Sequence, residues 1–180
     1  MFVKLARERR SIRKFRNKEI EPEKIDLLIQ AALLAPSSHS LYPWEFTVVS
    51  DPALLDKLSR AKKAGSAFLK NAPLGFVICG DSKRSDAWIE DCSIAATFVF
   101  LAAQSLGLGA CWIQIRNRMH DETSTAQTYV SDLLNLPEHL EVASIIAVGY
   151  PAETKRARTP DQLRYEKVYV NTYGTKYMTP

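Results

Sequence analysis

The sequence lacks the cysteine pattern of a disulfide framework or of a zinc site. Its three cysteines, Cys79, Cys92 and Cys111, are odd in number, share no ligand-like spacing and stand in apolar contexts. Disulfide-rich domains need paired cysteines, and structural zinc sites need closely spaced cysteine and histidine ligands. We therefore expect no bound metal and a reducing, cytoplasmic environment.

Long hydrophobic runs are also missing. The most apolar stretch, residues 94–103, is about half the roughly twenty residues that a membrane-spanning helix needs. The first residues lack the continuous apolar core of a secretion signal. We expect no contact with a membrane. An Arg-rich organelle presequence stays open as an alternative, although Glu8 and the helical pattern that soon follows argue against it.

The chain does contain enough apolar material for a core, because 46% of its 180 residues are hydrophobic. This composition suits one domain over residues 1–180. Residues 152–180 have little core pattern, and we interpret them as a C-terminal arm. The arm nevertheless carries apolar and aromatic residues, namely Leu163, Tyr165, Val168, Tyr169, Val170, Tyr173 and Tyr177. We expect the arm to pack on another surface, with a second copy of the chain as the candidate.

Apolar periodicity predicts helices that alternate with strands. The predicted helices span residues 22–35, 52–65, 86–106 and 123–136. The predicted strands span residues 45–50, 74–80, 110–115 and 142–148. The run at 74–80 is apolar throughout, which is typical of a strand that is buried on both faces.

Positive charge is concentrated at the start of the chain. Residues 1–18 hold eight bases and one acid, a net charge of +7, whereas residues 19–180 hold sixteen bases and nineteen acids, a net charge of −3. Five of the bases lie in the stretch RRSIRKFR, residues 9–16. A basic patch of this kind attracts anionic ligands.

The apolar residues inside this stretch argue against a bare basic tail. Ile12 and Phe15 are three apart, so a turn of chain can bury both. The residues that would then face one point are Arg9, Arg10, Ser11 and Arg13. Arginine makes planar, multi-donor contacts with phosphate oxygens, and a serine hydroxyl adds a neutral donor. The pattern therefore predicts a phosphate site.

Two more polar clusters follow, the loop at residues 36–42 and the basic residues Lys155, Arg156 and Arg158. Each cluster alone is explained equally well as solvated surface. Together, two basic clusters can reach one phosphate while the loop holds an attached ring. A basic nucleic-acid-binding module that uses residues 1–18 and 155–158 is the alternative, and it predicts affinity that falls steeply with salt.

Four segments also resemble the FMN-dependent nitroreductase family, in the same order and spacing over essentially the whole chain. They are RRSIRKF at 9–15, PSSHSLYPWEF at 36–46, SLGLGACWIQIRNR at 105–118 and VGYPAE at 148–153. The resemblance implies an α+β fold with a central mixed, mainly antiparallel β-sheet flanked by helices. It further implies a homodimer in which the C-terminal extension packs on the partner subunit.

The resemblance implies a cofactor site residue by residue. The FMN phosphate should contact Arg9, Arg10, Ser11 and Arg13, with Arg158 first and Lys155 second among the later basic residues. The isoalloxazine and ribityl chain should pass beside Pro36, Ser37, Ser38, His39 and Ser40, contributed by the other subunit. The backbone of Ile113 and Gln114 should donate to the reactive ring nitrogen.

The sequence departs from the family pattern at three positions of this site. Ser40 stands where asparagine is common, Tyr42 where glutamine is common, and Gln114 where many members have glycine. A serine hydroxyl offers fewer donors than an asparagine amide. Flavin affinity and substrate range are therefore open.

The implied function is NADH- or NADPH-driven two-electron reduction of a small oxidised acceptor, such as a nitroaromatic, a quinone or an enone. No side chain is expected to be catalytic, because the flavin carries the chemistry. A flavin-binding protein with weak or different turnover is the alternative inside the same fold. The sequence leaves both the natural acceptor and the choice between NADH and NADPH undecided.

Overall fold

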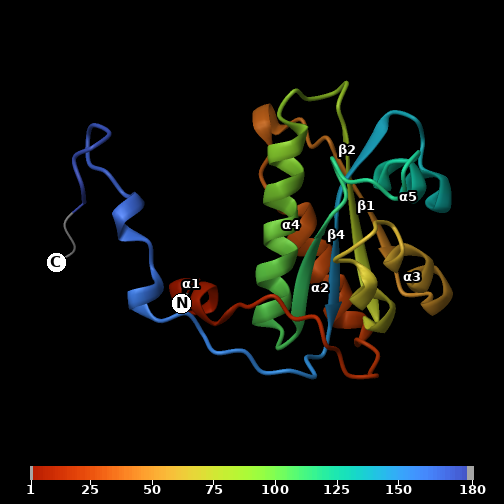
Figure 1. Cartoon of the computed structure of the whole chain (residues 1–180), viewed down its shortest axis with the longest axis horizontal. Helices are drawn as coiled ribbons and strands as arrows, with labels where there is room; N and C mark the ends of the chain where they lie inside the picture. Colours follow the sequence, from red (N-terminus) through yellow and green to blue (C-terminus); the bar gives the residue numbers. More distant parts are fainter. Residues whose placement is uncertain (1, 178–180) are drawn as a thin grey trace.

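Four strands form one antiparallel sheet in the computed structural model, which describes residues 2–177 (Figure 1). The strands are β1 (Trp44–Val49), β2 (Leu74–Asp81), β3 (Gly109–Gln114) and β4 (Leu140–Gly149), in the order β1-β2-β4-β3. The helices are α1 (Phe2–Glu8), α2 (Pro22–Leu33), α3 (Pro52–Ser59), α4 (Trp88–Ser105) and α5 (Ala126–Leu134). Short 3-10 turns lie at Ser38–Ser40, Ala67–Asn71, Pro160–Gln162 and Tyr165–Lys167. The α+β class and the antiparallel sheet confirm the expected fold.

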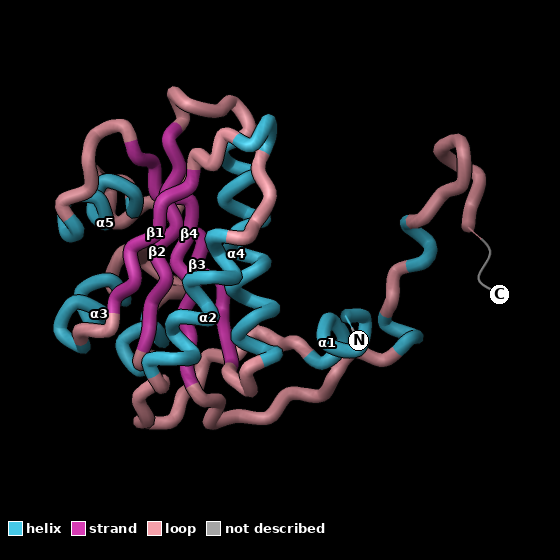
Figure 2. Tube along the Cα trace, turned by 180° about the vertical axis from the view of Figure 1, so that it is seen from behind, coloured by secondary structure: helices cyan, strands magenta, loops and turns pink. Residues whose placement is uncertain are grey.

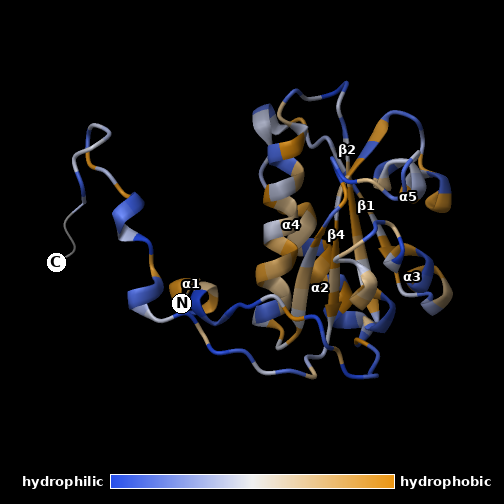
Figure 3. Ribbon diagram, in the orientation of Figure 1, coloured by the Kyte–Doolittle hydropathy of each residue, from blue (hydrophilic) through white to orange (hydrophobic). Residues whose placement is uncertain are grey.

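Helices cover both faces of the sheet (Figure 2). Helices α2 and α4 pack on one face, with Leu28, Ala95 and Val99 fully buried, and α3 and α5 pack on the other, with Leu58 and Val130 fully buried. The central strands β2 and β4 are buried along almost their whole length, as the apolar run at 74–80 predicts. Figure 3 shows the same distribution, with apolar residues gathered on the strands and on the helix sides that face them.

The basic N-terminal segment lies across one end of the sheet. Ile12 and Phe15 are buried, with exposed fractions of 8% and 9%, as predicted. The backbone is extended rather than turned, because Ser11 forms a parallel bridge with Ala110 and Phe15 an antiparallel bridge with Pro151. The prediction of a turn was therefore wrong, since sheet-edge hydrogen bonds take up the backbone of this segment.

Two glycines allow this close packing. A Cβ atom at Gly109 would lie 2.8 Å from the Cβ of Ile12, and one at Gly149 would lie 2.9 Å from the Cδ1 of Phe15 and 2.5 Å from the Cδ of Pro73. Both glycines are therefore required for the segment to reach the sheet. The basic side chains are carried on a fixed piece of backbone.

The arm extends away from the body, and α1 lies near the point where the arm leaves (Figures 1 and 2). Helix α1 was not predicted, and none of its residues is buried. Within the described part of the arm, Tyr165, Val168 and Tyr173 are exposed, by 42%, 43% and 90%. The arm does not cover its own chain, and its packing on a partner stays a prediction. In residues 2–177 no helix is both long enough and apolar enough to span a membrane.

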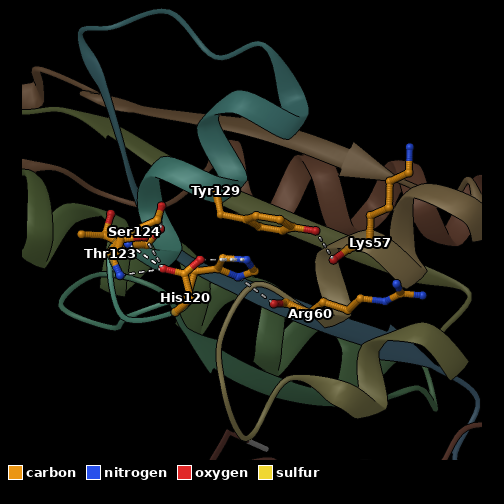
Figure 4. A network of polar contacts seen from close by, with 8 residues as sticks. Lys57, Arg60, His120, Thr123, Ser124 and Tyr129 are labelled. Atoms are coloured by element: carbon orange, nitrogen blue, oxygen red, sulfur yellow. Dashed lines mark hydrogen bonds and ion pairs between the residues drawn. The ribbon is translucent and has the colours of Figure 1, made fainter.

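Two predicted helices are shorter than expected, and Figure 4 shows why. Helix α3 ends at Ser59, where side chains of α5 and of the β3–α5 connection contact the carbonyls of its last turn and C-cap: the Tyr129 hydroxyl donates to the Lys57 carbonyl at 3.1 Å, and His120 Nδ1 lies 3.0 Å from the Arg60 carbonyl. Helix α5 begins at Ala126 instead of near residue 123. The N–H groups of Thr123 and Ser124 donate to the Asp121 carboxylate instead of entering a helix.

Candidate functional site

The two separated basic clusters meet at one end of β3. Lys155 Nζ donates to the Ser11 carbonyl at 2.7 Å, and the Arg158 N–H donates to the Arg7 carbonyl at 3.0 Å. The Arg10 guanidinium donates to the Arg156 carbonyl. Segments about 145 residues apart in sequence are thus joined by hydrogen bonds, in the way that the phosphate-site hypothesis required.

Positive charge is crowded at Arg9. Its guanidinium lies 4.7 Å from the centre of the Phe100 ring on α4. Burial lowers the pKa of Arg9, and the charges of Arg158 and Arg10 lower it further. Among residues 2–177 no carboxylate lies within salt-bridge distance of these three arginines. Holding the charges together costs free energy that a bound anion would offset.

The carboxylate of the nearby acid, Glu153, already has partners within the chain. Its carboxylate accepts the N–H groups of Arg13 at 2.6 Å and of Lys14 at 3.2 Å, and it lies 3.5 Å from Lys155 Nζ. The Arg13 N–H is the main reason why the pKa of Glu153 is lowered. Glu153 thus fixes the backbone that carries the bases and does not reach the guanidinium of Arg9.

Arg9 and Arg10 lie on different sides of the segment. Alternate side chains of an extended chain point to the same side, so Arg9, Ser11 and Arg13 form one row. Consistent with this, Ser11 and Arg13 both influence the buried Cys111 thiol of β3. Burial raises the pKa of this thiol, and its neighbours lower it, with Arg13 having the largest effect among them. Arg10 points instead toward the arm, where it lines an open hollow with Arg158, residues 161–164 and Glu166.

One further base, Lys62, lies in the neighbourhood of Cys111 and was not predicted from the sequence. Lys62 is partly buried; burial lowers its pKa, and the charge of Arg118 lowers it further. Arg118 belongs to the β3–α5 connection, of which His120 contacts the Arg60 carbonyl at the end of α3 (Figure 4). No local motif marks Lys62, because only the fold brings it near β3.

The backbone of β3 offers donors along its open edge, at Trp112 and, at the other end of the strand, at Gln114. The Ile12 N–H donates to the Ala110 carbonyl at 2.9 Å, so the backbone of Ala110 faces away from β4. Alternate residues of an antiparallel strand face the same edge, so the Gln114 N–H also points to the open edge and the Ile113 N–H points to β4. Of the two predicted donors, the geometry therefore favours Gln114.

The side chains at this end of β3 are held in place. The Ile113 side chain is fully buried. Trp112 Nε1 donates to Gln114 Oε1 at 3.0 Å, and Gln114 Nε2 donates to the Arg116 carbonyl at 3.0 Å. The Gln114 side chain, which the sequence placed near the ring or the substrate, is thus engaged by its own strand.

The loop at residues 36–42 is anchored and strained. The Ser38 N–H donates to the buried Asp91 carboxylate at 2.8 Å, and the Tyr42 N–H donates to Ser37 Oγ at 2.8 Å. His39, Ser40 and Tyr42 all have positive φ angles, of 50°, 54° and 47°. Non-glycine residues pay of order 1 kcal/mol each for this conformation, and such residues often gather at functional sites. Pro36 is exposed at the start of the loop.

One chain does not bring the loop and the basic cluster together. The loop is anchored at Asp91 near the start of α4, whereas Arg9 lies on Phe100, nine residues further along the same helix. Nine residues of α-helix span about 14 Å. The predicted site residues therefore form two separate groups in the single chain: the bases with β3, and the loop.

Comparison with known proteins identifies the family of the chain. The model of the Nitroreductase family matches residues 6–66 and 59–150. A solved FMN-dependent nitroreductase from Clostridium difficile R20291 is 48% identical and superposes with a TM-score of 0.94, over 95% of this chain and 99% of that one.

Two curated relatives match the chain over most of its length. A protein from Archaeoglobus fulgidus, described only provisionally as an NADH dehydrogenase/NAD(P)H nitroreductase, is 37% identical over 92% of this chain and 97% of its own length. The FMN reductase (NADPH) of Bacillus subtilis is 31% identical over 92% of this chain and 71% of its own. The chain belongs to the nitroreductase family.

Proposed function

We propose that the chain is an FMN-dependent oxidoreductase that takes two electrons from NADH or NADPH and passes them to a small oxidised acceptor. The observation that carries the proposal is the group of bases beside β3 that lack acid partners within the described residues, centred on Arg9. The names of the relatives, an FMN-dependent nitroreductase and an FMN reductase (NADPH), support the same cofactor and donor.

The phosphate of FMN would be held by the row of Arg9, Ser11 and Arg13 together with Lys155 and Arg158. An arginine row with a serine hydroxyl suits a dianionic phosphate. Arg10, which lies on the other side of the extended segment, would contribute less than Arg9. The residues present therefore fit the cofactor's anionic end.

The flavin ring would lie along the open edge of β3. Ala110 and Gln114 are four residues apart, which corresponds to about 13 Å of strand. The Gln114 N–H would hold the reactive ring nitrogen, and the buried Ile113 would keep the strand rigid behind it. Bound FMN supplies the hydride chemistry. The protein positions the ring and excludes water, so donor and acceptor are expected to bind in turn at the same place.

The loop with Pro36, Ser37, Ser38, His39 and Ser40 would come from a second copy of the chain. Exposed apolar side chains stand next to it, including Leu33 at 52% and Leu34 at 75%. Such residues, like those of the arm, are suited to an interface. The strained loop would then meet the ring held by the other copy's β3.

Mixed dimers test this sharing of the site. Arg9→Met damages the phosphate end, and Ser38→Trp blocks the loop. Suppose that each site takes Arg9 from one copy and the loop from the other. Every mixed dimer of the two variants then contains one intact site. The mixture should therefore regain activity that neither variant has alone. A mixture that stays inactive, although mixed dimers form, would contradict a shared site.

The cofactor assignment is tested by the colour and flavin content of the purified protein. We expect a yellow protein that releases FMN on denaturation, that is bleached by NADH or NADPH and that is reoxidised by a nitroaromatic, a quinone or an enone. Protein that binds FMN but turns over none of these acceptors would favour the weak-turnover alternative. Protein that takes up no FMN and binds DNA in a salt-dependent way would favour the nucleic-acid alternative.

A further inference from the structure

A groove separate from the proposed flavin site lies between the N-terminal segment and the connections of the sheet. One wall is residues 13–19, and the other is made by Ser50, Pro52, Leu55 and residues 70–73. Its volume of about 440 Å³ lies in the range of small-molecule sites. It shares only Arg13 with the predicted flavin contacts.

The groove holds a strong excess of positive charge. The bases that line it are Arg13, Lys14, Arg16, Lys18 and Lys70, and the acid is Glu19. Five bases and one acid give +4, which equals the net charge of the whole chain, so the residues outside the groove are neutral in sum. An anionic ligand would be drawn to this place by the field of the protein.

Two of these bases are free to bind once Arg13 is assigned to the proposed flavin phosphate. Lys18 is paired with Glu21 at 3.1 Å, and the Arg16 Nε donates to the Pro151 carbonyl at 3.0 Å. Within residues 2–177, Lys14 and Lys70 have no carboxylate within salt-bridge distance. They come from two different segments of the chain that both line the groove, so an anion in the groove can be approached by a base from each segment.

The remaining lining is apolar with a few neutral donors. Phe15, Leu55 and Ala72 are buried, and Pro73 lies beside them. Asn17, Ser50 and Asn71 provide amide and hydroxyl groups. Such a lining suits a ligand with an anionic group and an apolar or flat body.

The groove is also preformed. The Arg16 N–H donates to the Tyr150 carbonyl at 2.8 Å, and the Ala152 N–H donates to the Lys14 carbonyl at 2.8 Å. Gly149 admits both Phe15 and Pro73 at close range. A rigid wall lowers the entropy cost of binding.

We propose that this groove binds an organic phosphate of nucleotide size, with Lys14 and Lys70 as its anion contacts. The phosphate could belong to the adenosine end of the NADPH donor or to a free nucleotide. This inference does not require the proposed function, because binding can be measured whether or not the protein reduces anything.

Isothermal titration calorimetry of FMN-saturated protein tests the proposal, with 2′,5′-ADP, 5′-AMP and inorganic phosphate as probes at low salt. The double variant Lys14→Met, Lys70→Met should weaken nucleotide binding by about tenfold or more, as expected for charge-assisted hydrogen bonds. The matched control Lys83→Met, Arg84→Met removes two exposed charges at the β2–α4 connection and should change the affinity by less than about twofold.

Tighter binding of 2′,5′-ADP than of 5′-AMP would assign the groove to the NADPH donor, and equal binding would assign it to free nucleotides. Absence of binding to the unchanged protein, binding of inorganic phosphate alone, or equal losses in both double variants would overturn the proposal. Loss of FMN from the Lys14, Lys70 variant would also overturn it, because the groove would then be part of the flavin site. Failure of the protein to hold FMN at all would count against the proposed function alone.

Discussion

Two groups of charged side chains, one around Tyr150 and the other around Arg9, use similar residues in opposite ways. In the first group the charges are matched. The Tyr150 hydroxyl donates to Glu21 at 2.5 Å, Lys24 Nζ donates to the Tyr150 hydroxyl at 2.6 Å, and Lys18 Nζ donates to Glu21 at 3.1 Å. The pKa of Glu21 falls to about 2, chiefly because of the Tyr150 hydroxyl, and the pKa values of both lysines rise.

In the second group, around Arg9, the charges are unmatched. Burial and the neighbouring arginines lower the pKa of Arg9, which is the reverse of what happens to Lys18 and Lys24. The difference separates a cluster that stabilises the fold from one that is ready for an anion. The Gln114 N–H at the open edge of β3 is an unmatched polar group of the same kind.

The largest effect is expected at Gln114. Gln114→Pro removes the outward N–H but no hydrogen bond of the β3–β4 ladder, and proline is tolerated at such an edge position. Loss of one donor to developing charge costs about 100-fold or more in rate. Stopped-flow measurement of flavin reduction by NADH or NADPH checks this. An unchanged rate in a protein that still folds would show that this N–H is not used.

Next in size is the difference between Arg9 and Arg10. Arg9→Met keeps an apolar contact with Phe100 but removes the charge, and it should weaken FMN binding by about tenfold to 100-fold. Arg10→Met, the matched control, should weaken it less. Fluorescence titration of the apoprotein measures both affinities, and a melting curve checks folding. A larger loss of FMN affinity for Arg10→Met than for Arg9→Met would show that Arg10, and not Arg9, faces the phosphate.

A smaller effect, on stability, is expected in the matched group. Because the pKa of Glu21 is lowered from 4.5 to about 2, its stabilising effect is complete above pH 4.5 and is lost as the pH falls toward 2. Tyr150→Phe removes the main cause, so its melting temperature should be lower than that of the unchanged protein at pH 7 and should fall less on acidification. FMN affinity should not change. Parallel pH curves for the two proteins would contradict the assignment.

The smallest effect concerns an unmatched group that has no proposed ligand. The Ser144 hydroxyl is fully buried in β4, and it has no hydrogen-bond partner among residues 2–177. Removing a buried, unsatisfied hydroxyl relieves a cost, so Ser144→Ala should be neutral or stabilising by up to about 1 kcal/mol. Urea unfolding measures the change. Clear destabilisation, accompanied by loss of FMN, would place Ser144 among the groups that serve the site.

The sequence predicted the elements that a buried core determines. The strands begin and end within about two residues of the predicted positions, because apolar runs such as 74–80 can only be buried. The end of α3 was missed, since side chains distant in sequence, His120 and Tyr129, contact its last carbonyls. The start of α5 was missed because the Asp121 carboxylate takes the N–H groups of Thr123 and Ser124. The extended form of residues 9–15 was missed for the same reason: its hydrogen-bond partners lie near residues 110 and 150.

The candidate site also has parts that could be predicted from the sequence and parts that could not. The meeting of the early and late basic clusters could be predicted, because charge and a family resemblance both mark them. The separation of Arg9 from Arg10 could not, since it depends on backbone direction. Lys62 carries no local signal, and only the fold brings it near Cys111 and Arg118.

The most direct test of the unmatched cluster is the affinity of the apoprotein for FMN compared with riboflavin, which lacks the phosphate. If the bases around Arg9 hold the phosphate, the unchanged protein should bind FMN at least about tenfold more tightly than riboflavin, and Arg9→Met should remove most of that preference while riboflavin binding stays the same. Equal affinities for FMN and riboflavin in the unchanged protein, or a preference that survives Arg9→Met, would contradict the account.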